Sequence, residues 1–82
     1  MLWHLKPPAL EPFLVTVQVE DEFWVGDMVY FDRKREALVG EWALVEVEDR
    51  LLIKRREEGD CVIGRVMRRE REAGTISQVT HY

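Results

Sequence analysis

The chain has 82 residues, of which 46% are hydrophobic and 34% are charged. This length fits one domain, and the composition is typical of a globular protein rather than a disordered or membrane-spanning one. The formal net charge of −4 argues against broad attraction to nucleic acid, which needs a surplus of Lys and Arg on the binding face. A domain of this size buries only about 60–65% of its unfolded surface, so we expect modest stability unless a partner covers more.

Residues 1–12 are predicted to form an extended N-terminal arm. Pro7, Pro8 and Pro12 each fix φ and lack an amide donor, so they exclude a helix or a central strand here. The arm lacks the apolar run of roughly 7–15 residues that marks a secretory signal peptide. No stretch approaches the ~20 apolar residues of a membrane span, so we expect a cytoplasmic protein with no membrane partner.

Two features of the composition bear on the environment of the protein. The single cysteine, Cys61, cannot form an internal disulfide, which fits a reducing compartment. Because it precedes Val62 and Ile63, we expect Cys61 to be a small buried hydrophobe rather than a reactive thiol. The chain contains no asparagine, and most of its charges are Glu and Arg, a balance that indicates a thermostable protein.

Residues 13–82 are predicted to form a single all-β domain. From Phe13 to Glu20 the apolar side chains alternate with the others, which is the period of a strand with one buried face. Further segments rich in β-forming residues and separated by turn signals are expected over residues 28–33, 42–47, 51–54 and 61–67. Five or six short, mostly antiparallel strands predict a small, partly open barrel.

The segment around residue 40 decides between two local structures. A helix over residues 33–44 is the alternative to a loop followed by a strand, but Gly40 in its interior disfavours the helix. In the strand over residues 42–47 we expect Ala43, Val45 and Val47 to form the inner face.

Five short motifs follow one another between residues 26 and 71. In chain order they are Gly26-Asp27-Met28-Val29, Gly40-Glu41, Val47-Glu48-Asp49, Ile53-Lys54-Arg55 and Ile63-Gly64-Arg65-Val66. Their order and spacing resemble the C-terminal domain of the LexA-type self-cleaving repressors, a Ser-Lys protease fold related to signal peptidases. The resemblance implies a truncated version of that β fold, because the region after Lys54-Arg55 is shorter here than in the family.

The resemblance also implies where catalytic residues would lie. In the family a serine precedes the Gly-Asp turn, and the lysine of the Lys-Arg pair takes its proton, which requires that lysine to be neutral. Lys54 falls at the matching lysine position, but the matching serine position, near residues 21–23, offers Glu22 and no hydroxyl. The only serine is Ser77. We therefore expect no enzyme activity, with Lys54 either a vestigial catalytic residue or simply a solvated strand lysine.

No cofactor or metal is predicted. The spacing of Asp21, Glu22 and Asp27 matches no calcium loop, and Glu22 is expected to be a loop carboxylate. Among the tryptophans, Trp42 is expected in the core, whereas Trp3 and Trp24 are candidates for contact with a partner.

Two functional classes remain open. The first is a non-catalytic relative of the Ser-Lys proteases that acts as an interaction or dimerisation module and forms a homodimer through the arm or a strand edge. The alternative is a small β-barrel that binds nucleic acid through the basic run Arg65–Arg71. Because Glu70 and Glu72 dilute this run and no aromatic residue interleaves with it, we expect a solvated strand end and consider nucleic-acid binding unlikely. A DNA-binding repressor is not expected, because the arm is too short for a helix-turn-helix.

Overall fold

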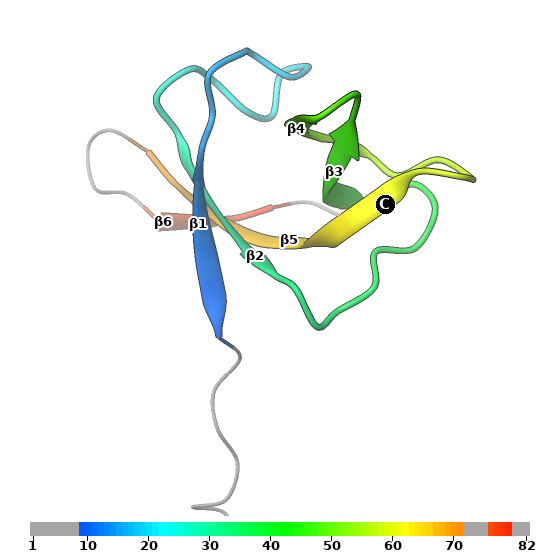
Figure 1. Cartoon of the computed structure of the whole chain (residues 1–82). Helices are drawn as coiled ribbons and strands as arrows, with labels where there is room; N and C mark the ends of the chain where they lie inside the picture. The colour runs from blue at the N-terminus through cyan, green and yellow to red at the C-terminus, as the bar shows by residue number, and fades with distance from the viewer. Residues whose placement is uncertain (1–8, 72–75, 80–82) are drawn as a thin grey trace, which may run out of the picture.

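The computed structural model describes residues 9–71 and 76–79, and within them the chain is all-β (Figure 1). The strands are β1 (Leu10–Leu14), β2 (Met28–Asp32), β3 (Trp42–Val47), β4 (Arg50–Arg55), β5 (Cys61–Glu70) and β6 (Ile76–Gln78). All six belong to one antiparallel sheet in the order β1-β2-β5-β3-β4, and β6 pairs with β5. The sheet is not closed between β1 and β4, which confirms the predicted small, partly open β fold.

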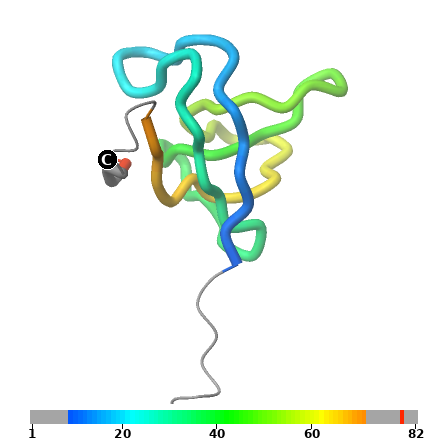
Figure 2. The backbone as a smooth tube through the Cα atoms, turned by 90° about the vertical axis from the view of Figure 1, so that its left-hand side faces the viewer, coloured from blue at the N-terminus to red at the C-terminus, as the bar shows by residue number. Residues whose placement is uncertain are grey.

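The long strand β5 organises the sheet. Its first half pairs with β3, and its second half pairs with β2 on one edge and with β6 on the other. The register shifts once in the pairing with β2 and once in the pairing with β3, and such bulges bend and twist a strand. The backbone of β2 also crosses very close to Gly64, where a Cβ would lie 2.6 Å from the carbonyl oxygen of Asp32. Figure 2 shows the resulting curled sheet from the side.

The core has two parts on opposite faces of β3. The larger cluster contains Val15, Phe23, Val29, Phe31, Trp42, Leu44, Ile53, Val66 and Val79. The smaller cluster, which we call the outer cluster, contains Ala37, Ala43 and Val45. The expectation that Ala43, Val45 and Val47 form the inner face was therefore wrong: Trp42 and Leu44 face the larger core, and Val47 is 41% exposed. The loop that contains Ala37 covers the second face of β3, so both faces of the strand are buried over residues 42–45.

The first strand lies earlier in the chain than the alternation predicts. β1 begins at Leu10, inside the predicted arm, and ends at Leu14. Pro12 is tolerated because β1 is an edge strand, where one amide donor is not needed. From Val15 the chain leaves the sheet as a loop, in which Val15 N–H donates to Asp27 O at 2.8 Å and Gly26 N–H donates to Val15 O at 2.9 Å. The remainder of the predicted arm, residues 1–8, lies outside the described residues.

The loop over residues 33–41 contains no helix, so the β alternative was right there. In the described part of the chain no helix is long and apolar enough to cross a membrane.

Candidate functional site

Lys54, the residue at the lysine position of the resemblance, lies on β4 and is held by two carboxylates. Its Nζ lies 3.0 Å from a carboxylate oxygen of Asp60 and 3.4 Å from one of Glu57. The hydrogen bond to Asp60 is the main cause that raises the pKa of Lys54 above its ordinary value, against a smaller opposing effect of desolvation. A lysine can act as a general base only in its neutral form, and these contacts instead favour the charged ammonium.

Asp60 is in turn held as an anion. The backbone N–H of Glu57 donates to its carboxylate at 2.8 Å. This hydrogen bond, followed by the one from Lys54, lowers the pKa of Asp60 below its ordinary value. Lys54 and Asp60 therefore form a charged pair that ties β4 to the start of β5.

The orientation of β4 separates Lys54 from the loop where the nucleophile would lie. In the β3–β4 register Lys54 pairs with Ala43, which belongs to the outer cluster. Glu22 precedes Phe23, whose ring meets the Trp42 ring edge-on at 4.9 Å in the larger core. Lys54 and Glu22 are thus associated with opposite faces of β3. Ser77 lies in β6, where it pairs with Arg69 of β5, and β6 has no pairing with β4.

Glu22 belongs to a group of charges that we call the arginine clamp, formed by Glu22, Asp27, Arg69 and Arg71. Arg69 Nη1 lies 2.9 Å from a carboxylate oxygen of Glu22 and also donates to its backbone oxygen. Arg71 donates to the same backbone oxygen at 3.0 Å and lies 3.4 Å from the Asp27 carboxylate. The clamp fastens the loop of residues 20–27 to β5. Glu22 is therefore a loop carboxylate, as expected, and its role is to hold this loop.

The basic run Arg65–Arg71 is not the solvated strand end that we expected. β5 extends to Glu70, and Arg69 is buried, with 6% of its surface exposed. Arg65 lies 3.3 Å from the Glu41 carboxylate, and Arg69 and Arg71 belong to the clamp. Of the four arginines, Arg68 alone is exposed and makes no ion pair with another described residue. Most of the positive charge of the run is therefore neutralised by nearby carboxylates.

Three other expectations concern single side chains. Cys61 is exposed, so the prediction of a buried position was wrong: it pairs with Glu46, where β3 has already left the core. Trp42 is fully buried, as expected, and lies 4.4 Å from the guanidinium of Arg55. Trp24 is 44% exposed, and Trp3 lies outside the described residues. No group of three or more potential metal ligands occurs in the described part of the chain.

An apolar groove lies between the edge strand β4 and the segment formed by the end of β1 and the loop that follows it, and we call it the seam groove. It encloses about 70 Å³ and is lined by Phe13, Val15, Thr16, Val17 and Val19 on one side and by Leu51, Leu52 and Ile53 on the other. Val17 is 70% exposed and Leu51 46% exposed, whereas Val15 and Ile53 belong to the core. The groove therefore leads from solvent to the core. Its volume is far below the ~300 Å³ of small-molecule pockets, so it fits side chains rather than a free ligand.

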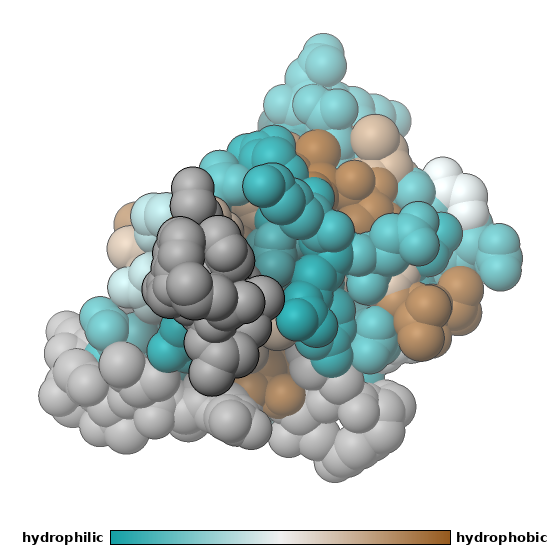
Figure 3. All heavy atoms as spheres, turned by 90° about the horizontal axis from the view of Figure 1, so that it is seen from below, coloured by the Kyte–Doolittle hydropathy of each residue, from teal (hydrophilic) through white to brown (hydrophobic). Residues whose placement is uncertain are grey.

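The edges of the seam groove carry charge. Glu20, on the loop after β1, lies 3.8 Å from Arg55 of β4, so this ion pair joins the two sides. Seen from below in Figure 3, most of the visible surface is hydrophilic, with small separate apolar patches.

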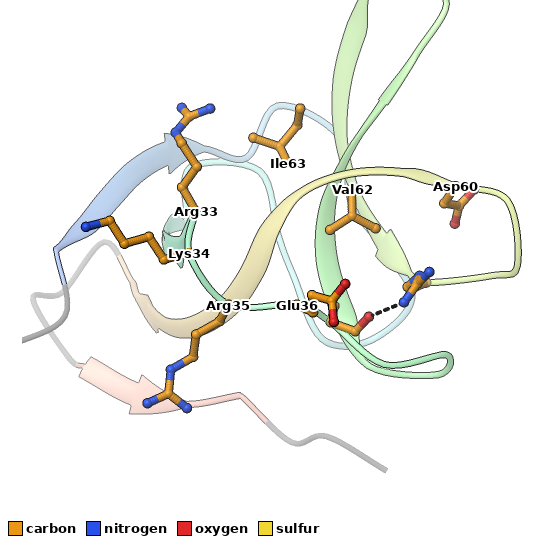
Figure 4. A pocket seen from close by; sticks show the side chains of 9 residues that line it. Arg33, Lys34, Arg35, Glu36, Asp60, Val62 and Ile63 are labelled. Carbon is orange, nitrogen blue, oxygen red and sulfur yellow. Dashed lines mark hydrogen bonds between the residues drawn. The ribbon is translucent and has the colours of Figure 1, made fainter.

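A second hollow, of about 280 Å³, lies beside the loop between β2 and β3. It is lined by Arg33, Lys34, Arg35, Glu36, Ala37, Arg56, Asp60, Val62 and Ile63. Figure 4 shows that Arg33, Lys34 and Arg35 point away from one another rather than toward a common centre. Arg33 makes two hydrogen bonds to Glu11, at 2.8 and 2.9 Å, and Arg35 lies 3.6 Å from Asp32. We assign no ligand to this hollow.

The seam groove and the arginine clamp were not foreseen from the sequence. Arg69 and Glu22 are 47 residues apart, and no local pattern links them. Pro12 was the one local signal of an edge strand. No protein-family model, no curated protein and no solved structure matches this chain, so its function has to be argued from its own geometry.

Proposed function

We propose that this chain is a non-catalytic relative of the Ser-Lys self-cleaving proteases that serves as an interaction and dimerisation module. The observation that carries the proposal is the seam groove, an apolar groove between the edge strand β4 and the loop that follows β1. The resemblance over residues 26–71 is the ground for proposing that the chain is related to this family. The groove is the surface through which we expect it to associate.

The surroundings of Lys54 support a non-catalytic role. A lysine that activates a serine works in its neutral form, which needs a lowered pKa. Lys54 has two carboxylates within 3.4 Å, and its pKa is raised. The position that would supply the nucleophile holds Glu22, whose carboxylate is engaged by Arg69. Neither side chain is arranged for peptide-bond cleavage.

The edges of the sheet support association. β1 and β4 are the end strands, and each has one strand neighbour in the described part of the chain. An unpaired edge exposes a row of backbone donors and acceptors that another strand can use. Burying a few hundred Å² of apolar surface at the groove would contribute several kcal/mol, at about 25 cal/mol per Å², before ordering costs are subtracted. A two-fold dimer is the simplest closed arrangement for such a surface.

Light scattering over protein concentrations from about 1 to 100 µM tests the proposal. We expect the mass to rise from the 9.7 kDa of one chain to twice that value. Leu51→Glu places a charge in the groove and should weaken association at least tenfold. Leu38→Glu is the matched control, because Leu38 is also an exposed leucine, 65% against 46% for Leu51, but does not line the groove. A wild-type chain that stays monomeric throughout, or equal effects of the two variants, would contradict the proposal.

A second measurement tests the absence of catalysis. Incubation at alkaline pH, where a lysine base is most active, should leave the intact mass unchanged. Fragments that appear with the wild-type chain and disappear with Lys54→Ala would show that Lys54 is catalytic after all.

A further inference from the structure

We infer that the seam groove receives residues 1–8 of a second copy of the chain, which add to β4 as an extended strand. The inference rests on the proposed dimerisation function and names the segment that makes the contact. Each copy would give its segment and receive that of the other, which yields a closed two-fold dimer with equal contacts on both sides.

The groove has the features of a strand-addition site. Leu51 and Ile53 of β4 both line it and stand two residues apart, which is the spacing of neighbouring side chains on one face of a strand. The outer edge of β4 pairs with no other strand in residues 9–71 and 76–79. An added strand can therefore combine main-chain hydrogen bonds to this edge with side chains that enter the groove.

The sequence of residues 1–8 suits this groove. Trp3 and Leu5 are two residues apart, so an extended segment presents both on one side, while His4 and Lys6 face the other way. Eight extended residues span roughly 26 Å, somewhat more than the ~20 Å length of a six-residue strand such as β4.

Chain geometry favours the groove of a second copy over the groove of the same copy. The segment joins β1 at Leu10, but the groove is lined from Phe13 onward, toward the other end of β1. To reach its own groove the segment would have to reverse direction within a few residues of Leu10. Pro7 and Pro8 oppose that reversal, because a residue that precedes a proline is held extended.

A deletion and a peptide test the occupant. A chain that lacks residues 1–8 keeps every described residue, and circular dichroism should show an unchanged β fold. We expect it to be monomeric at concentrations where the full chain is a dimer. A synthetic peptide of residues 1–8 should bind the shortened chain, at least tenfold more weakly after Leu51→Glu and with unchanged affinity after Leu38→Glu.

Cysteine cross-linking tests which copy is contacted. In a Cys61→Ser background, Leu5→Cys combined with Leu51→Cys should give a disulfide-linked dimer on oxidation, and Leu5→Cys combined with Leu38→Cys should not. A disulfide within one chain would show that the segment contacts the groove of its own copy, which would overturn the proposed exchange of segments between two copies. A dimer that persists after deletion of residues 1–8 would overturn the inference while leaving the dimerisation module intact. A full chain that is monomeric would overturn both.

Discussion

The arginine clamp and the seam groove both involve the loop after β1, but they are built from different interactions. At the clamp, Arg69 and Arg71 bind Glu22 and Asp27 and fasten a loop against β5. At the seam, the loop after β1 faces β4 mainly through apolar side chains, and the ion pair between Glu20 and Arg55 joins the two sides. A buried charge needs a partner of opposite charge within the same chain, because an unpaired buried charge is costly. Apolar side chains at the rim of a groove can instead be covered by a second chain. We therefore expect the clamp to contribute mainly to stability, whereas the proposed association would use the seam.

Loss of the clamp should have the largest effect on folding. Arg69→Met removes the buried cation, 7% of whose side chain is exposed, and leaves the half-buried Glu22 carboxylate without it. We expect the free energy of unfolding to fall by about 3 kcal/mol, the lower end for a broken buried pair. Urea denaturation measures this change. Arg68→Met is the matched control on the same strand, with an expected change within about 0.5 kcal/mol. Equal decreases in the free energy of unfolding of the two variants would show that the clamp does not stabilise the fold.

A methyl group at the centre of β5 should have the next largest effect. In Gly64→Ala the new Cβ would lie 2.6 Å from the backbone oxygen of Asp32, so β2 and β5 would have to move apart. Such overpacking costs about 1–3 kcal/mol. Cys61→Ala, at an exposed position of the same strand, serves as the control in the same denaturation series. An unchanged free energy of unfolding in Gly64→Ala would mean that the curl of β5 does not depend on this close approach.

The pair between Lys54 and Asp60 should contribute a small, pH-dependent stability. Because the pKa of Asp60 is lowered in the folded state, its contribution is complete above the ordinary pKa of aspartate and is lost as the pH falls through the lowered value. The stability difference between wild type and Lys54→Met should therefore shrink on acidification. It should persist at alkaline pH until the raised pKa of Lys54 is passed. Denaturant titrations at several pH values test this, with Arg50→Met of the same strand as control, and a difference that grows on acidification would contradict it.

Binding to nucleic acid should be the smallest of the predicted effects. With most of the Arg65–Arg71 run neutralised and a net charge of −4, we expect binding weaker than about 10⁻⁶ M at physiological salt. Fluorescence titration with single- and double-stranded DNA and with RNA measures it. Tighter binding that depends steeply on salt and is lost in Arg68→Ala would favour the nucleic-acid alternative.

The fold class followed from the sequence because it depends on local patterns. The β-forming stretches around residues 28–33, 42–47, 51–54 and 61–67 all became strands close to the predicted bounds. Glu48 and Asp49 form the turn between β3 and β4, with both residues at positive φ, as a type I′ hairpin turn requires. The first strand was misplaced because alternation in Phe13–Glu20 reports burial and not pairing. Val15 is buried under a loop without being part of a strand.

The candidate site was predictable only in part. The sequence alone placed Lys54 on a strand and showed that no serine stands near the Gly-Asp turn, since both statements concern residue identity and local pattern. The direction in which Lys54 points depends on its register with Ala43, and the burial of Arg69 depends on a loop 47 residues earlier in the chain. The seam groove depends on how far the sheet curls. Residue identity and period determined the strands and the missing nucleophile, whereas the clamp and the seam were decided by the tertiary structure, because long-range contacts and sheet curvature arise only when distant strands pack.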